Sequence, residues 1–134
     1  MDPEVTSGAR RTTVMVVDDD RDLLWLLSRV LRKKGFDVQG FFSAPSVETV
    51  KKIDPAVLFL DVEIGGESGE VVCERIKHST DLPKFPVILI SSHAKERLRE
   101  TAQRCGADGY LTKPFNLRGM AMLAKYYVSR PPAI

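Results

Sequence analysis

Residues 56–63 decide how this chain folds, and they read Ala56-Val57-Leu58-Phe59-Leu60-Asp61-Val62-Glu63. Five apolar residues follow the turn-forming pair Asp54-Pro55, a pattern typical of a strand buried on both faces of a parallel sheet. A carboxylate, Asp61, appears where this run stops. In open parallel α/β sheets, ligands and chemistry collect at the carboxyl ends of the strands. The stretch therefore predicts a central strand that carries Asp61 at the functional edge of its sheet.

Three other strand-like runs also end in polar side chains. They are Val14-Met15-Val16-Val17 before Asp18-Asp19-Asp20, Val87-Ile88-Leu89-Ile90 before Ser91-Ser92, and Tyr110-Leu111-Thr112 before Lys113-Pro114. A lone aspartate after a strand is usually just a polar residue leaving the sheet. Four runs that end in this way instead predict that carboxylates, hydroxyls and an amine meet at one edge of one sheet.

Helical patterns separate these strands. We expect strands at 12–17, at 36–42 on the sheet edge, at the run ending at residue 61, at 87–90 and at 110–112. We expect helices to about residue 34, from the turn at 43–46 to about 53, from the loop at 64–69 to about 78, at 95–104 and from 117 to about 128. Asp20 or a neighbour and Asn116 are the expected caps, and Gly35 ends the first helix. Five strand–helix alternations predict right-handed crossovers and a three-layer (βα)5 sandwich with a parallel sheet.

The helical spacing also predicts which side chains are buried. In the first helix the expected apolar stripe is Leu23, Leu26, Leu27, Val30 and Leu31. In the fourth helix only three residues are expected to face inward: Leu98, Ala102 and Cys105. The last helix is expected to bury Leu117, Met120, Ala121, Ala124 and Val128. The fourth helix thus has few apolar anchors, as expected of a marginal element that can shift.

Composition limits the classes of function. The chain has 134 residues, 43% hydrophobic and 28% charged, as expected of one globular domain. A net charge of +2, without a block of basic residues, argues against a nucleic-acid or anionic-membrane partner. No apolar run approaches the ~18 residues of a membrane span, and residues 1–13 lack a secretory signal. Cys73 and Cys105 lack metal or redox spacing, which favours reduced thiols in a cytoplasmic protein.

The polar runs resemble the receiver domain of bacterial two-component response regulators, including chemotaxis receivers. The matching pieces occur in family order and spacing: Val17-Asp18-Asp19, Leu60-Asp61, Gly69, Pro86 to Ser91, and Gly109 to Phe115. The resemblance implies a flavodoxin-like sheet with strand order 2-1-3-4-5. It also implies a receiver domain at 12–129, with a flexible leader at 1–11 and a C-terminal tail at 130–134.

The resemblance assigns roles by position. Asp61 corresponds to the phosphoacceptor, and Mg²⁺ or Mn²⁺ would be held by Asp18, Asp19, Asp61 and the backbone carbonyl of Glu63. Lys113 corresponds to the lysine that contacts the phosphoryl group. Ser91 corresponds to the hydroxyl that binds the phosphoryl group and moves with the switch aromatic, Tyr110. The expected response is a repacked surface on the fourth helix, fifth strand and fifth helix.

Some residues depart from the family pattern or lie in its variable positions. Ile64-Gly65 stands where receivers commonly have Met-Pro, so a more mobile glycine-rich loop is expected at 64–69. Glu63 and His93 occupy positions that tune phosphoryl lifetime in the family, unless they are merely solvated loop residues. Trp25 is expected on an exposed face with Ser28, Arg29 and Arg32, as either a partner contact or a side chain lying along the helix.

The leading expectation is a phosphorylatable switch, without enzyme turnover beyond its own phosphorylation and dephosphorylation. Expected partners are a sensor histidine kinase or phosphotransfer protein, with homodimerisation on phosphorylation. The chain ends soon after its last helix, so we expect either a standalone regulator or a receiver excised from a longer protein.

The alternative to this reading is a pseudo-receiver, which would bind partners without being phosphorylated. A haloacid dehalogenase-type phosphatase is disfavoured because Glu63 and Gly65 occupy its Asp and Thr positions. A Rossmann domain is disfavoured because no Gly-x-Gly-x-x-Gly follows the first strand.

Overall fold

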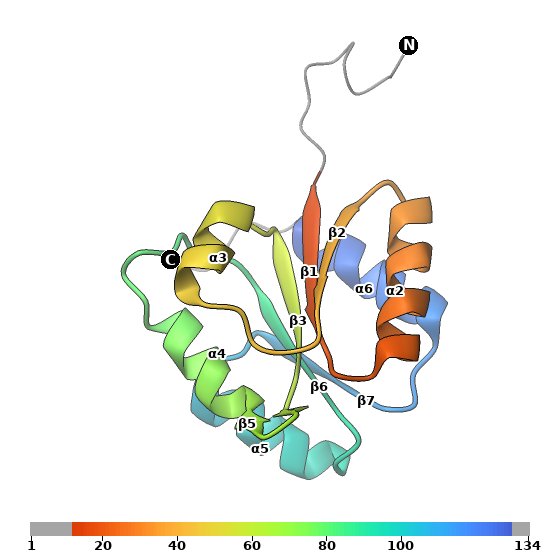
Figure 1. Cartoon of the computed structure of the whole chain (residues 1–134). Helices are drawn as coiled ribbons and strands as arrows, with labels where there is room; N and C mark the ends of the chain where they lie inside the picture. The colour runs from red at the N-terminus through yellow and green to blue at the C-terminus, as the bar shows by residue number, and fades with distance from the viewer. Residues whose placement is uncertain (1–11, 130–134) are drawn as a thin grey trace.

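The computed structural model describes residues 12–129 as a parallel five-stranded sheet with helices on both faces (Figure 1). The sheet strands are β1 (Thr13–Val17), β2 (Asp37–Phe41), β3 (Val57–Asp61), β6 (Val87–Ser91) and β7 (Gly109–Thr112). The helices are α2 (Arg21–Lys33), α3 (Val47–Ile53), α4 (Gly69–Lys77), α5 (Lys95–Cys105) and α6 (Leu117–Val128). The leader and tail expected at 1–11 and 130–134 lie outside the described residues.

The strand order across the sheet is β2-β1-β3-β6-β7. Two further short strands, β4 (Glu63–Ile64) and β5 (Glu67–Ser68), pair only with each other, which is why the labels skip within the main sheet. Counted along the chain, the five sheet strands have the predicted order 2-1-3-4-5. Strand β2, in which one residue of five is buried, lies at an edge as expected, and the other edge strand is β7, whose four residues are partly buried.

Alternating side chains of the sheet build two hydrophobic clusters, one on each face. Val14 and Val16 of β1 point to the face covered by α2 and α6, whereas Met15 and Val17 point to the face covered by α3, α4 and α5. This alternation follows from the two-residue period of a strand. Because both faces are covered, β3 and β6 are buried along their whole length, as the apolar run in β3 predicted.

The buried stripe of α2 differs from the predicted one. The buried residues are Leu24, Leu27, Ser28 and Leu31, while Leu26 is 42% exposed. The helix is therefore rotated towards Leu24, in an i, i+3, i+7 pattern centred on Leu27. Ser28 was wrongly placed on the exposed face. Its burial is tolerated because its Oγ donates a hydrogen bond to the Leu24 carbonyl oxygen at 2.8 Å.

Residues 63–68 form an antiparallel hairpin and not an irregular loop. Glu63 pairs with Ser68 and Ile64 with Glu67. Gly65 and Gly66 have φ values of +39° and +90° at the two central positions, as a type I′ turn requires. The hairpin places Ile64 in the core at 2% exposure, so apolar packing holds it against the domain.

Helix α5 buries Leu98, Ala102 and Cys105 as predicted, and also Thr101. In α6, Met120, Ala121 and Ala124 are buried, whereas Leu117 and Val128 are only partly buried. Helices α4 and α5 bring the two cysteines together, with Cys73 Sγ 3.5 Å from the Cys105 carbonyl oxygen. Both thiols are free and buried.

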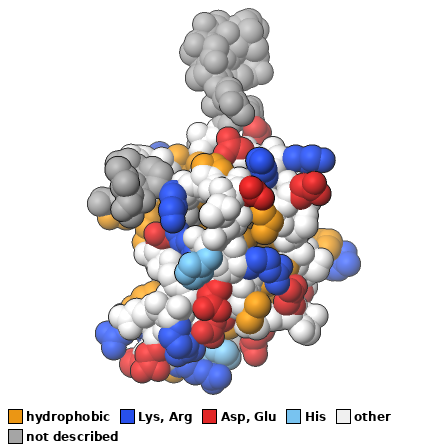
Figure 2. Space-filling model, turned by 90° about the vertical axis from the view of Figure 1, so that its left-hand side faces the viewer, with side chains coloured by type: hydrophobic (Ala, Val, Ile, Leu, Met, Phe, Trp, Pro, Cys, Tyr) orange, Lys and Arg blue, Asp and Glu red, His pale blue; other side chains and the backbone are white. Residues whose placement is uncertain are grey.

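The outer face of α3 and α4 mixes acidic and basic side chains (Figure 2). Nearby, Arg104 of α5 forms a two-point ion pair with Glu70 of α4, at 2.9 and 3.2 Å. The hydrogen bonds from Arg104 lower the pKa of the Glu70 carboxyl below its ordinary value. Across residues 12–129, no helix is both long enough and apolar enough to span a bilayer.

Candidate functional site

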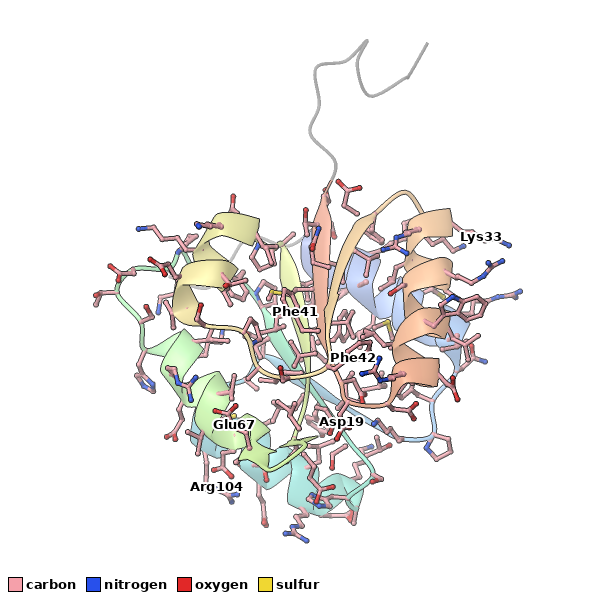
Figure 3. All side chains as sticks on the ribbon, in the orientation of Figure 1. Asp19, Lys33, Phe41, Phe42, Glu67 and Arg104 are labelled. Atoms are coloured by element: carbon pink, nitrogen blue, oxygen red, sulfur yellow. The ribbon has the colours of Figure 1, made fainter. Side chains whose placement is uncertain are left out.

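Three aspartates meet at the carboxyl edge of the sheet, where β1 and β3 end. One carboxylate oxygen from each of Asp18, Asp19 and Asp61 lies within 4.8 Å of the other two. Asp18 and Asp61 are buried at 0% and 5% exposure, whereas Asp19 is exposed. Figure 3 shows Asp19 at this end of the sheet, near the hairpin that carries Glu67. The adjacent parallel strands β1 and β3 bring these residues together, as the sequence predicted.

Backbone amides hold the two buried carboxylates in place. Asp18 Oδ1 accepts a hydrogen bond from the Asp20 N–H at 2.9 Å, and Asp61 Oδ1 accepts one from the Glu63 N–H at 2.9 Å. In each case the donor N–H lies two positions after the aspartate. The turn that follows the strand therefore fixes the orientation of the aspartate side chain at the end of the strand. The second oxygen of each aspartate is left to face the cluster.

Lys113 brings a positive charge to these second oxygens. Its Nζ lies 2.9 Å from Asp61 Oδ2 and 3.0 Å from Asp18 Oδ2. Burial by itself would lower the pKa of Lys113, but hydrogen bonds to Asp61 and Asp18 outweigh it and raise the pKa above its ordinary value. Lys113 therefore remains a cation that bridges the ends of β1 and β3 from the loop after β7.

Burial disfavours the charged form of the Asp18 carboxyl. Burial raises the pKa of its carboxyl to about 6, against opposing hydrogen bonds from Asp20 and Lys113. Its Oδ2 is also buried, and among residues 12–129 its polar contact is the Lys113 ammonium at 3.0 Å. A buried carboxylate oxygen with unused acceptor capacity is a place where a cation would be stabilised.

Comparison with known proteins identifies the family. The family model described as the response regulator receiver domain matches residues 14–125. The chain belongs to this family. A putative response regulator from Chloroflexus aurantiacus is 25% identical with a TM-score of 0.82, covering 90% of this chain and 100% of that one. The NtrX receiver domain from Brucella abortus is 27% identical, with a TM-score of 0.78 and coverages of 88% and 99%. The BeF3-activated receiver domain of Thermotoga maritima DrrB is 28% identical, with a TM-score of 0.75 and coverages of 90% and 100%.

The donor set of this receiver domain fits a hard divalent cation. Mg²⁺ prefers oxygen ligands and is usually held by one or two carboxylates together with water. The three clustered oxygens of Asp18, Asp19 and Asp61 meet this requirement, and the buried Asp18 Oδ2 keeps acceptor capacity beyond its contact with Lys113. Receiver domains in general bind Mg²⁺ at an acidic pocket of this kind.

The predicted residues for the switch and for phosphoryl lifetime lie on β4, β6 and β7 and in the loop that follows β6. Ser91 is buried at the end of β6, and its Oγ accepts a hydrogen bond from the His93 N–H at 3.0 Å. The His93 ring approaches Glu63, with Nε2 and Oε2 3.7 Å apart. Tyr110 is partly buried and packs against the core cluster on the α3–α5 face. Lys113 also donates its backbone N–H to the Ser91 carbonyl oxygen at 2.7 Å.

Trp25 lies apart from this cluster, on the outer face of α2. It is 59% exposed, as predicted, and the Arg29 guanidinium lies 4.9 Å from the centre of its ring. The Arg21 guanidinium, at the start of α2, lies 4.0 Å from the centre of the Phe42 ring, which belongs to the β2–α3 connection. The receiver domain therefore presents two arginine–aromatic pairs on one side of α2.

Sequence reasoning missed one contact that shapes the site. The Gly65 N–H donates a hydrogen bond to Asp19 Oδ2 at 3.1 Å, from the turn of the β4–β5 hairpin. The available signal was the Gly65-Gly66 pair, which is typical of a two-residue hairpin turn. Even so, the strand pattern around it is only two residues long on each side.

Proposed function

We propose that this receiver domain is the phosphoacceptor switch of a two-component phosphorelay and that Asp61 accepts the phosphoryl group. The donor is the phosphohistidine of a sensor histidine kinase or a phosphotransfer protein. The observation that carries the proposal is the convergence on Asp61 of two further aspartates and the Lys113 ammonium. Transfer breaks the N–P bond of the donor and forms a P–O bond to an Asp61 carboxylate oxygen.

Each neighbour has a role in that transfer. Asp18, Asp19 and Asp61, with the backbone carbonyl of Glu63, would hold the Mg²⁺ or Mn²⁺. The bound cation supplies positive charge that offsets the repulsion between the carboxylate and the phosphoryl group. Lys113 adds a second positive charge at Asp61 Oδ2. The hydroxyl of Ser91 accepts from His93 and still has its own proton to donate to a phosphoryl oxygen.

Phosphorylation adds ~1.5 to 2 negative charges beside Ser91 and thereby drives the switch. Ser91 moves towards the phosphoryl group, and Tyr110 turns into the space that it leaves. Helix α5 is the element that responds, and it is held to the domain by Leu98, Thr101, Ala102 and Cys105. The changed surface of α5, β7 and α6 passes the signal on, by homodimerisation or by binding a target. A Tyr110→Ala variant that signalled normally would count against this route.

The proposed activity is self-phosphorylation and slow self-dephosphorylation, without turnover of a separate substrate. Glu63 and His93 flank the site and stand where they affect the approach of water. The arginine–aromatic surface of Trp25 and Arg29 supports a contact with the kinase or phosphotransfer partner, since Trp and Arg are enriched where partners bind tightly.

The test is intact mass after incubation with Mg²⁺ and acetyl phosphate. We expect a phosphoryl adduct that is lost in Asp61→Asn and in the absence of Mg²⁺. The matched control is Asp22→Asn, which removes an exposed carboxylate from the first turn of α2 and should leave the adduct unchanged. Light scattering with beryllofluoride measures dimerisation. A wild-type protein that bound Mg²⁺ but formed no adduct would instead be a pseudo-receiver.

A further inference from the structure

The two cysteines of the chain meet between α4 and α5, which lie side by side on one face of the sheet (Figure 1). Cys73 lies in the middle of α4, and Cys105 is the last residue of α5, 32 positions further along the chain. Both side chains are fully buried. Cys73 Sγ donates a hydrogen bond to the Cys105 carbonyl oxygen at 3.5 Å, so it points at the residue that carries the second thiol. Only the fold brings these thiols together, because their separation in the sequence is not a redox spacing.

The contact between the cysteines is one of three that join the same two helices. The pairs are Glu70 with Arg104, Cys73 with Cys105, and Lys77 with Gly106. The α4 members follow one another at intervals of three and four residues, so they share one face of that helix. On one side of the cysteines lies the two-point ion pair of Arg104, and on the other a Cβ built on Gly106 would lie 3.9 Å from Lys77 Cβ. The two cysteines are therefore held facing each other from both sides.

The two thiols differ in acidity. The hydrogen bond with Cys73 lowers the pKa of the Cys105 thiol below its ordinary value, against the opposing effect of burial. The same hydrogen bond, together with burial, raises the pKa of the Cys73 thiol. Because the thiolate is the reactive form of cysteine, Cys105 is the thiol that reacts first and Cys73 is its neighbouring partner.

We propose that Cys73 and Cys105 are a redox modification site, at which hydrogen peroxide forms a reversible disulfide that links α4 to α5. The Cys105 thiolate attacks one peroxide oxygen, so that an S–O bond forms, the O–O bond breaks, and the hydroxide released takes up the proton that the thiol lost. The Cys73 sulfur then attacks the sulfenic sulfur of Cys105, which forms the S–S bond and breaks the S–O bond. The second hydroxide takes the Cys73 proton. The two thiols are thereby oxidised, and one hydrogen peroxide is reduced to two waters.

Peroxide reaches the buried pair from the end of α5. Cys105 is the last residue of this helix, and Gly106, which follows it, is exposed. Helix ends open locally at a low cost in free energy. Hydrogen peroxide is close to water in size, so a small opening of the last turn admits it.

The disulfide restrains the helix that responds to phosphorylation, a consequence that rests on the proposed function. In the reduced protein an ion pair and packing join the end of α5 to α4, and both can break and re-form. A disulfide instead fixes the sulfurs of Cys73 and Cys105 about 2.05 Å apart. Coupling between two events is reciprocal, so a restraint on the movement of α5 also weakens the binding of a phosphoryl group at Asp61. Oxidation therefore lowers the affinity for beryllofluoride, which stands in for that group.

The first measurement tests the disulfide itself in the full chain. The protein is treated with hydrogen peroxide and denatured, and intact mass then counts the thiols that react with iodoacetamide. We expect the count to fall from two to none and dithiothreitol to restore both thiols. Two reactive thiols after treatment, or a disulfide between two copies of the chain, would overturn the proposal. This measurement needs no variant.

Single variants test which thiol reacts first. In Cys73→Ala, the sulfenic acid on Cys105 has no partner thiol, and we expect dimedone to trap it. In Cys105→Ala, we expect about tenfold less dimedone adduct, because the remaining thiol has a raised pKa. Equal adducts in the two folded variants would overturn the assignment of Cys105 as the attacking thiol.

The second measurement tests the restraint on α5. Titration calorimetry with beryllofluoride and Mg²⁺ should show a Kd about 5- to 10-fold weaker after oxidation, with recovery in dithiothreitol. The control is the double variant Cys73→Ala/Cys105→Ala, whose Kd should not change on treatment. It also reports any effect of oxidised methionines such as the exposed Met122, which dithiothreitol does not restore.

The outcomes separate this inference from the proposed function. An equal loss of affinity in the double variant, or a disulfide that forms without changing the Kd, would overturn the restraint on α5. A reduced wild-type protein that bound Mg²⁺ but no beryllofluoride would count against the phosphoacceptor function, whereas the thiol count would still decide whether the disulfide forms.

Discussion

The Asp19 carboxylate is held by the Gly65 N–H at 3.1 Å, across 46 residues of sequence. Gly65 lies in the hairpin turn, and a Cβ built on it would be 3.7 Å from Asp19 Oδ2, an ordinary contact. Where receivers commonly have proline, this chain therefore has a residue with an N–H to donate. The one exposed aspartate of the cluster is thus positioned by the hairpin and not by its own strand.

This contact predicts a difference between two substitutions at Gly65. Alanine retains the N–H, and its only cost is the steric strain of a positive φ at this position. We therefore expect the Mg²⁺ affinity of Gly65→Ala to stay within about twofold of the wild-type value. Proline lacks the N–H and cannot adopt a positive φ, so we expect Mg²⁺ affinity to fall about tenfold, as loss of a supporting hydrogen bond usually does. Titration calorimetry measures both. Equal affinities for the two variants would show that the Gly65 bond does not hold Asp19.

Gly69 allows the start of α4 to lie against the end of β3. A Cβ on Gly69 would collide with the Asp61 carbonyl oxygen and lie 2.7 Å from Val62 Cα. Because the obstructing atoms are backbone, we expect Gly69→Ala to lower the free energy of unfolding by roughly 2–3 kcal/mol. Gly119→Ala in α6 is the control, because it meets nothing nearer than Asn116 Cβ at 3.8 Å. Urea denaturation should show Gly119→Ala unchanged or slightly stabilised; equal losses would contradict the packing argument.

The raised pKa of Asp18 predicts how stability depends on pH in the metal-free protein. The carboxyl titrates near 6 when folded and near 3.8 when unfolded, so the unfolded state loses this proton first as pH rises. The contribution of Asp18 to stability therefore decreases between about pH 4 and pH 6 and stays low above that. We expect Asp18→Asn to stabilise the metal-free protein by roughly 1–3 kcal/mol at pH 8, and by less at pH 5. Thermal melts at the two pH values measure this, and a gain that did not depend on pH would be inconsistent with it.

Lys77 is predicted to matter for stability but not for phosphorylation. Its Nζ lies 2.5 Å from Asp108 Oδ2 and donates to the Phe85 carbonyl oxygen at 3.0 Å, at the opposite end of the sheet from Asp61. Lys77→Met leaves these partly buried acceptors without their donor, which we expect to cost about 1–3 kcal/mol. Lys84→Met, at an exposed position, should be neutral. If acetyl phosphate phosphorylated the folded Lys77→Met protein more slowly than wild type, the contacts of Lys77 would affect the Asp61 site, contrary to this prediction.

The strand pattern was enough to predict much of this molecule. Buried strands are marked by uninterrupted apolar runs, so β1, β3 and β6, and the polar residues that end them, could be read directly. Parallel pairing then required Asp18, Asp61 and Ser91 to reach one edge of the sheet, and Lys113 followed from the same rule. The buried stripe of α2 was harder to predict, because all seven residues at positions 23–27 and 30–31 are apolar and several rotations of the helix fit their spacing equally well.

Local sequence by itself determined the order of the elements, the buried strands, and which strand ends carry Asp61, Asp18 and Lys113. It did so because burial on both faces and the two-residue period leave strong local patterns. Only the tertiary structure decided the contacts between distant segments. These are the Gly65 bond to Asp19, the close approach of Gly69 to Asp61, and the contact of Cys73 with Cys105. Such contacts depend on how the packed layers bring loops and helix ends together. The local sequence around either residue of a long-range contact does not indicate which distant residue it will meet.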